Sequence, residues 1–107
     1  MARERGLIKK IAHKRFNGDV SAAKRELMYV ATSAAKRLLE EAGITEKPGL
    51  SWFVALKAVL PVFWEIVRRK DDIPTVEEVV AEVKRRYPNI ITVLRTYHKP
   101  LLQGATV

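Results

Sequence analysis

The segment "LSWFVALKAVLPVFWEIV", residues 50–67, constrains the fold of this chain of 107 residues more than any other part. It is apolar almost without a break, and only Ser51, Lys57 and Glu65 interrupt it. A run of this kind is typical of a helix that is buried on most sides. Its length would also allow a membrane span, but a charged Lys57 near the centre makes a span costly. We therefore expect a central helix and no membrane span.

Glycine and proline positions divide the rest of the chain into pieces with helical periodicity. The last piece is ambiguous, because its β-branched residues favour a strand whereas Asn89 as N-cap favours a helix; no partner strand is evident, so we predict a helix. The sequence predicts an all-α protein, with a basic N-terminal helical arm at residues 1–18 and a small helical bundle at residues 19–107. The expected helices cover residues 3–16, 20–42, 51–70, about 75–87 and 89–99.

Local signals mark where these helices begin, bend and end. Gly43 is placed as the residue that closes the second helix. Ser51 is a good N-cap for the third, and Pro61 should kink it. Thr75 and Glu78 have the spacing of a capping box, in which each satisfies a backbone donor beside the other.

The charge of the chain is concentrated in its first part. The formal net charge is +8, and residues 1–40 hold ten Lys and Arg against four Asp and Glu, whereas residues 41–107 hold ten against eight. The basic residues come in doublets at Lys9-Lys10, Lys14-Arg15, Lys24-Arg25 and Lys36-Arg37. This pattern indicates a polyanion partner, with nucleic acid first and an anionic membrane surface second. A solvated charged surface is the plain alternative.

The expected helix at residues 20–42 has two unlike faces. One face is apolar and rich in alanine, and the opposite face carries Arg25, Tyr29, Thr32, Ser33 and Lys36, whose side chains suit phosphate oxygens. Together with the first segment, this face gives the candidate nucleic-acid-binding residues. They are Arg3, Arg5, Lys9, Lys10, His13, Lys14, Arg15, Lys24, Arg25, Tyr29, Thr32, Lys36 and Arg37. Binding should ignore base sequence, because this region has no Gln and its single Asn is in a turn.

Four aromatic residues in the apolar segment suggest self-association. Trp52, Phe53, Phe63 and Trp64 are hard to bury together in one small domain, so we expect them at a subunit interface. The partner would be another copy or a related subunit.

Catalytic and metal-binding patterns are absent from the sequence. It has no cysteine, no Walker loop, no Gly-rich dinucleotide turn and no HExxH motif. His13 and His98 both lie beside lysines without a spaced carboxylate partner. We expect no enzyme activity, no metal and no cofactor. The N-terminus lacks a signal-peptide run, which favours an intracellular place or a virion, and few Asn and Gln fit a thermophile.

The order of features resembles the coat proteins of rod-shaped and filamentous archaeal viruses. The matching features are the basic helical arm, "EEAGIT" closing a helix, the long apolar helix, and "VKRRYPNIITVL" with its Tyr-Pro-Asn break. The resemblance implies a structural viral capsid protein that coats double-stranded DNA without reading its sequence. It also implies a filament of many copies, often built from dimers that clasp the DNA, with the duplex in A-form.

Two alternatives remain open. A host nucleoid protein would share most of these features. A helix-turn-helix regulator can be drawn over residues 74–102, with Thr92, Arg95, Thr96 and His98 facing a major groove. This second alternative leaves the basic first 40 residues without a role.

Overall fold

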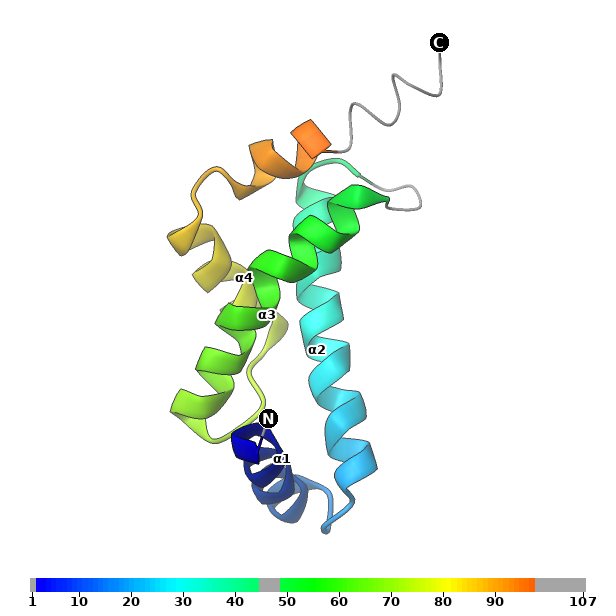
Figure 1. The fold of residues 1–107 in the computed structure, drawn as a ribbon, viewed down its shortest axis with the longest axis vertical. Helices are drawn as coiled ribbons and strands as arrows, with labels where there is room; N and C mark the ends of the chain where they lie inside the picture. Colours follow the sequence, from blue (N-terminus) through cyan, green and yellow to red (C-terminus); the bar gives the residue numbers. More distant parts are fainter. Residues whose placement is uncertain (1, 45–48, 98–107) are drawn as a thin grey trace.

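The computed structural model describes residues 2–44 and 49–97, with side chains from residue 5 onward, and in this part of the chain every regular element is a helix. Figure 1 shows an elongated arrangement of helices. The helices are α1 (Ala2–Arg15), α2 (Val20–Glu41), α3 (Leu50–Lys70) and α4 (Val76–Arg86), followed by a helical segment at residues 90–97. The prediction of an all-α fold is confirmed, and the segment after Pro88 is a helix rather than a strand.

A tight turn joins α1 to α2. Asn17 and Gly18 both have a left-handed backbone, with φ of 51° and 84°, and the Gly18 N–H donates to the carbonyl of Ala12 at 2.9 Å. Asp19 then begins α2, because its carboxylate accepts the N–H of Ala22 at 3.1 Å. The turn therefore closes one helix and caps the next.

Two of the predicted helix boundaries are confirmed in detail. Gly43 has φ of 79°, and the N–H of Ile44 reaches the carbonyl of Leu39 at 2.9 Å, which is the hydrogen bond of a glycine-closed helix end. At α4, Thr75 accepts the Glu78 N–H at 3.1 Å while the Glu78 carboxylate accepts the Thr75 N–H at 2.9 Å. The capping box is complete.

α3 begins near Ser51, as predicted, but the prediction that Ser51 is its N-cap is wrong. Gly49 is the N-cap without a side-chain hydrogen bond, and the helix begins at Leu50. Ser51 is instead fully buried, and its hydroxyl has no hydrogen-bond partner among the described residues. The apolar run turns this position toward the core, so its orientation follows from packing rather than from capping preference.

Pro61 lies inside α3, as expected. Proline has no N–H to donate to the carbonyl of Lys57, so the helical hydrogen-bond ladder is interrupted at this turn. Figure 1 shows that α3 changes direction along its length.

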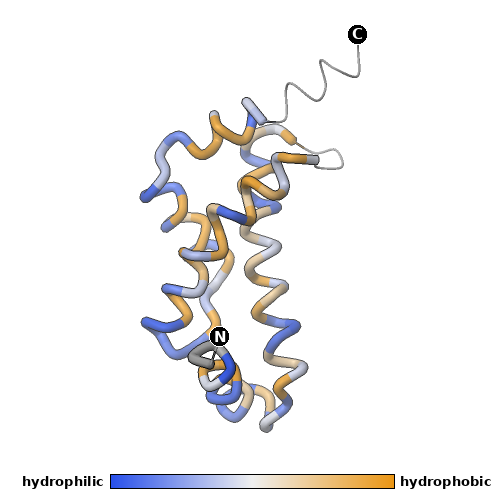
Figure 2. The backbone as a smooth tube through the Cα atoms, in the orientation of Figure 1, coloured by the Kyte–Doolittle hydropathy of each residue, from blue (hydrophilic) through white to orange (hydrophobic). Residues whose placement is uncertain are grey.

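One core joins all of these helices, and α1 is part of it. α2 packs against α1, α3 and α4, and α3 also packs against α4. Leu7, Ile8 and Ile11 of α1 are buried in the same hydrophobic cluster as Leu27 of α2 and Phe63 of α3. The expected boundary between the arm (residues 1–18) and the bundle (residues 19–107) falls at the turn between α1 and α2. Both helices contribute residues to the same core. Figure 2 shows hydrophobic residues along most of α3 and hydrophilic ones at its end.

Candidate nucleic-acid interface

The outer side of α1 is lined with cations at helical spacing. Arg5, Lys9 and His13 recur every four residues and are exposed, while the opposite side of the helix is buried. His13 also lines a hollow of about 340 Å³ together with Lys10, Lys14 and Asp71. Arg3 belongs to the expected set, but its side chain lies outside the described residues.

The basic doublets divide into one paired and one outward residue. In three of the four, the second residue pairs with an acid from a distant part of the chain: Lys10 with Asp71 at 3.5 Å, Arg15 with Asp72 at 2.9 Å, and Arg37 with Glu77 at 3.4 Å. The first residue of each, namely Lys9, Lys14 or Lys36, is exposed and forms no ion pair within the described part of the chain.

The divergence of neighbouring residues explains this division. Adjacent residues on a helix point about 100° apart, so one member of a doublet can face the acids of α4 and the turn after α3 while the other faces outward. We expected both members to reach phosphates. Lys10, Arg15 and Arg37 also form ion pairs within the chain, whereas Lys9, Lys14 and Lys36 form none within its described part.

The outer face of α2 carries the second row of candidate residues. Arg25, Tyr29 and Lys36 are exposed, and Tyr29 is 64% exposed. The Thr32 hydroxyl is half-buried and donates to the carbonyl of its own helix at Met28, 2.8 Å away, so only its lone pairs remain for a ligand. From Arg25 to Lys36 the face spans roughly 16 Å, which covers several phosphates.

Two cations that were not in the predicted set belong to the same basic end. Arg68 and Arg69, in the last turn of α3, are exposed and have no ion pair with any residue that the structure describes. The turn that follows them contacts α1 through the Lys10–Asp71 pair. The run Arg68-Arg69-Lys70 is visible in the sequence. The fold adds that Lys70 forms an ion pair with Glu78 at 2.8 Å.

The cations of α4 are committed to ion pairs. Arg86 binds Glu65 of α3 and lies 2.9 Å from Glu82 of its own helix, and Lys84 lies 2.7 Å from Glu41 of α2. Hydrogen bonds from Arg85, and then from Arg86, lower the pKa of the Glu82 carboxyl to about 2. These pairs join α4 to its neighbours, so the exposed cations that have no ion pair in the described part of the chain lie mainly on α1, α2 and the end of α3.

The expected interface aromatics fall into three environments. Phe63 is 1% exposed and packs edge to face against Trp64, with ring centroids 5.2 Å apart. Phe63 therefore leaves almost no surface for a subunit interface. Phe53 is 66% exposed, and Trp52 and Trp64 are half-buried. Three of the four rings are therefore accessible to a partner.

α3 is long and apolar enough to cross a membrane, and in the described ranges 2–44 and 49–97 it is the only such helix. It packs against α2 and α4, as the core helix of a globular fold does. The finding is compatible with the expected absence of a membrane span.

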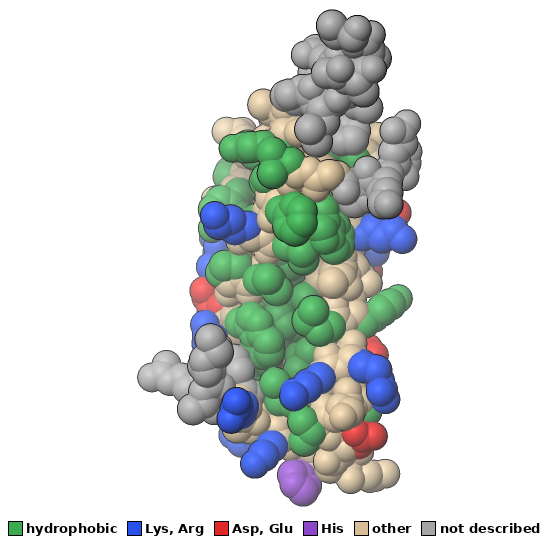
Figure 3. All heavy atoms as spheres, turned by 45° about the vertical axis from the view of Figure 1, so that its right-hand side comes forward, with side chains coloured by type: hydrophobic (Ala, Val, Ile, Leu, Met, Phe, Trp, Pro, Cys, Tyr) green, Lys and Arg blue, Asp and Glu red, His purple; other side chains and the backbone are tan. Residues whose placement is uncertain are grey.

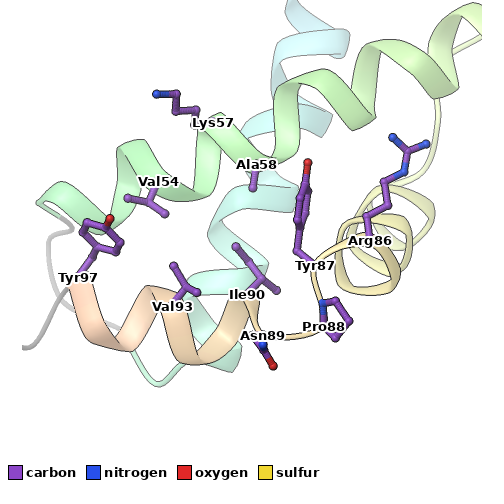
Figure 4. Close-up of a pocket in the computed structure, with 10 residues that line it drawn as sticks. All are labelled: Val54, Lys57, Ala58, Arg86, Tyr87, Pro88, Asn89, Ile90, Val93 and Tyr97. Carbon is purple, nitrogen blue, oxygen red and sulfur yellow. The ribbon is translucent and has the colours of Figure 1, made fainter.

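An apolar groove lies between α3 and the helical segment at residues 90–97 (Figure 4). Its volume is about 640 Å³, and Val54, Ala58, Ile90 and Val93 point into it from the two sides. None of the candidate phosphate-binding residues whose side chains the structure describes lines this groove. No cluster of metal-ligating side chains occurs among the residues that the structure describes.

The residues of the helix-turn-helix alternative have structural partners. Arg95 donates from Nε to the carbonyl of Ala42 at 3.1 Å, which closes the end of α2. Thr96 donates to the carbonyl of Thr92 in its own helix at 2.9 Å. His98 lies outside the described residues. Arg95 thus connects the helical segment at residues 90–97 to the end of α2.

Comparison with known proteins assigns no family. No protein-family model, no curated protein and no solved structure matches this chain.

Proposed function

We propose that this protein packages double-stranded DNA, binding the phosphate backbone without regard to sequence and associating with copies of itself. The observation that carries the proposal is the set of exposed cations on α1 and α2 that form no ion pair in the described part of the chain. They are Arg5, Lys9, Lys14, Lys24, Arg25 and Lys36. Phosphate contacts of this kind fix position on a duplex and carry no sequence information.

The second half of the proposal rests on the exposed aromatics of α3. Phe53 is exposed, and Trp52 and Trp64 of the same helix are half-buried, so α3 leaves apolar side chains that a second subunit would cover. A basic surface for DNA and an apolar surface for other copies are the two parts that a coat requires. The role is structural and involves no catalysis.

The architectural resemblance to archaeal viral coat proteins supports a filament in a virion as the setting. A host nucleoid protein would use the same two surfaces. A helix-turn-helix regulator has less support, because Arg95 is held by the end of α2.

The division of the doublets supplies the test. We would compare the variant Lys9/Lys14/Lys36→Gln with the matched variant Lys10/Arg15/Arg37→Gln, which removes the other residue of the same three doublets. Surface ion pairs contribute about 0–1 kcal/mol each, so both variants should fold. Affinity for several unrelated duplexes would be measured from about 50 to about 300 mM salt, a range over which phosphate contacts strongly affect binding.

The outward variant should reduce the slope of log affinity against log salt by about 0.9 per lost contact, equally on every duplex. The matched variant should change the slope much less. Equal effects of the two variants, or a loss confined to one duplex, would contradict backbone binding by the outward lysines.

A further inference from the structure

A hollow lies between the second half of α1 and the turn that follows α3. Its volume is about 340 Å³, and it is lined by Lys10, His13, Lys14 and Asp71. Figure 3 shows Lys and Arg side chains, together with the histidine, at the lower end of the molecule, where α1 lies in Figure 1. We call this site the α1 hollow.

The three basic residues of the α1 hollow are neighbours on the surface of one helix. His13 and Lys14 lie three and four residues after Lys10, so their Cβ atoms are about 5–6 Å from that of Lys10. All three side chains are exposed. A phosphate group presents several oxygens, so one group that enters the hollow can accept hydrogen bonds from more than one of these side chains.

Asp71 opposes an anion at this site. It is the one carboxylate among the described residues that line the hollow, and its Oδ2 lies 3.5 Å from Lys10 Nζ. An anion in the hollow is therefore repelled by Asp71 and also competes with it for Lys10. Lys14 forms no ion pair in the described part of the chain, so this competition does not extend to it.

The neighbouring acid, Asp72, forms a much firmer contact with α1. Its carboxylate is half-buried and contacts Arg15 Nε and Nη2 at 2.9 and 3.0 Å. The contact between Lys10 and Asp71 is longer, and the two side chains are 67% and 52% exposed. Exposed pairs of this kind contribute little stability. The Arg15–Asp72 pair therefore holds the turn against α1, whereas Lys10 can exchange Asp71 for another anion.

We propose that the α1 hollow is a phosphate subsite and that Asp71 limits its affinity by holding Lys10. This inference rests on the proposed function, which makes a phosphate of duplex DNA the ligand. While Lys10 contacts Asp71, His13 and Lys14 are the side chains left for a phosphate. Removing the charge of Asp71 removes a repulsion and adds Lys10 to the phosphate contacts.

The variant Asp71→Asn tests the role of this acid without disturbing the turn. Asp71 has a left-handed backbone, with φ of 54°, and its N–H donates to the carbonyl of Val67 at 2.8 Å. Asparagine tolerates this backbone well, so the substitution removes the charge and keeps the helix end. Glu40→Gln is the matched control, because it removes the same charge from an exposed residue that does not line the hollow. Glu40 lies about 30 Å along α2 from the end that joins α1.

Two probes separate the subsite from duplex binding as a whole. Inorganic phosphate would be titrated at constant pH and ionic strength while the NMR signals of the His13 ring are followed, with chloride as the reference anion. Affinity for several unrelated duplexes would be measured by fluorescence anisotropy from about 50 to about 300 mM salt. Phosphatidylglycerol vesicles would serve as an anionic surface without nucleic acid.

Inorganic phosphate should shift the His13 signals of wild type, and in Asp71→Asn it should do so at a concentration about threefold lower, because a nearby like charge is gone. On every duplex Asp71→Asn should steepen the slope of log affinity against log salt by about 0.9, the value of one added contact. Adding Lys10→Gln to Asp71→Asn should return the slope to that of wild type. Glu40→Gln should leave both the phosphate titration and the slope almost unchanged.

The phosphate titration would overturn the inference if the His13 signals responded to phosphate no more than to chloride, or if Asp71→Asn responded as wild type does. On duplexes, two results would overturn it: a slope that steepens equally in Glu40→Gln, and a gain in Asp71→Asn that persists without Lys10. Stronger binding of Asp71→Asn to the vesicles, with no change on duplexes, would also overturn it. Failure of the proposed function would look different: no variant would bind a duplex, while inorganic phosphate would still shift the His13 signals and Asp71→Asn would still bind it more tightly.

Discussion

Arg15 Nε lies 2.9 Å from Asp72 Oδ1, and this pair ties the end of α1 to the turn that follows α3. Burial raises the pKa of the Asp72 carboxyl, but the hydrogen bond from the Ile73 N–H and the nearby Arg15 outweigh burial, so that the pKa lies below its ordinary value. Three other carboxyls have lowered pKa values for related reasons: Glu65 beside Arg86, Glu78 beside Lys70, and Glu82 beside Arg85. Each of these acids binds a cation in the folded chain.

Acid should therefore destabilise the fold over a defined range. A carboxyl whose pKa is lower in the folded than in the unfolded chain contributes stability above its unfolded pKa, and this contribution is lost as the pH falls through the folded pKa. For Glu82 the range runs from 4.5 down to about 2. Urea unfolding at several pH values should show the midpoint falling across this range. In Glu82→Gln the fall should be shallower, and an unchanged pH profile would contradict the assignment.

Arg86 should matter more to stability than its neighbour Arg85. Arg86 binds Glu65 across the α3–α4 contact, whereas Arg85 binds only Glu82 in its own helix. The side chain of Arg86 is 28% exposed and that of Arg85 is 69% exposed. Thermal unfolding followed by circular dichroism should give a lower Tm for Arg86→Gln than for Arg85→Gln. Equal values would show that the bridge between the helices contributes nothing.

Replacing Thr75 of the capping box should lower the stability of the fold, whereas replacing Thr32 should not. Thr75→Ala removes a hydroxyl that accepts the Glu78 N–H at 3.1 Å, and it should lower the free energy of unfolding by about 1 kcal/mol. Thr32→Ala is the control, because the Thr32 hydroxyl bonds only carbonyls of its own helix. Its effect should be close to zero. Denaturant unfolding of both variants is the measurement, and a larger cost at Thr32 would reverse the expected order.

Two phenylalanines of α3 should respond in opposite ways to truncation. Phe63 is 1% exposed, so Phe63→Ala should cost about 3–5 kcal/mol in the free energy of unfolding. Phe53 is 66% exposed, so Phe53→Ala should leave the stability of the monomer almost unchanged. Sedimentation at high protein concentration should show weaker self-association in Phe53→Ala. A large stability loss at Phe53 in dilute solution would mean that its ring is already covered.

Boundaries set by neighbouring residues could be predicted from the sequence. Gly43 and the Thr75–Glu78 box depend on hydrogen bonds within six residues of chain, and both predictions are confirmed. Ser51 shows the limit of such local rules. Its type suits an N-cap, but the position faces the core, so the helix begins at Leu50 instead. The apolar segment has no clear periodicity. Its sequence therefore could not predict that Phe63 lies in the core and Phe53 on the surface.

The division of the basic doublets could not be predicted, because the acids that cause it are far away in the chain. Arg15 and its partner Asp72 are separated by 57 residues, and Arg37 and Glu77 by 40. Charge counting found the basic region correctly as a region. Only the packing of α1 and α2 against α3 and α4 shows which residue of each doublet has no ion pair within the described part of the chain.

The dimensions of the elongated body, 53 × 25 × 22 Å, limit how many chains fit along a duplex in the proposed coat. A duplex carries one phosphate charge per roughly 1.7 Å of its axis, so a chain that lies with its narrowest width of 22 Å along the duplex would cover about 13 phosphates. A chain of net charge +8 cannot neutralise that length alone, whereas two chains on opposite sides of the duplex slightly exceed it. Electroneutrality would then place two chains on every six or seven base pairs, which is about 22 Å of duplex.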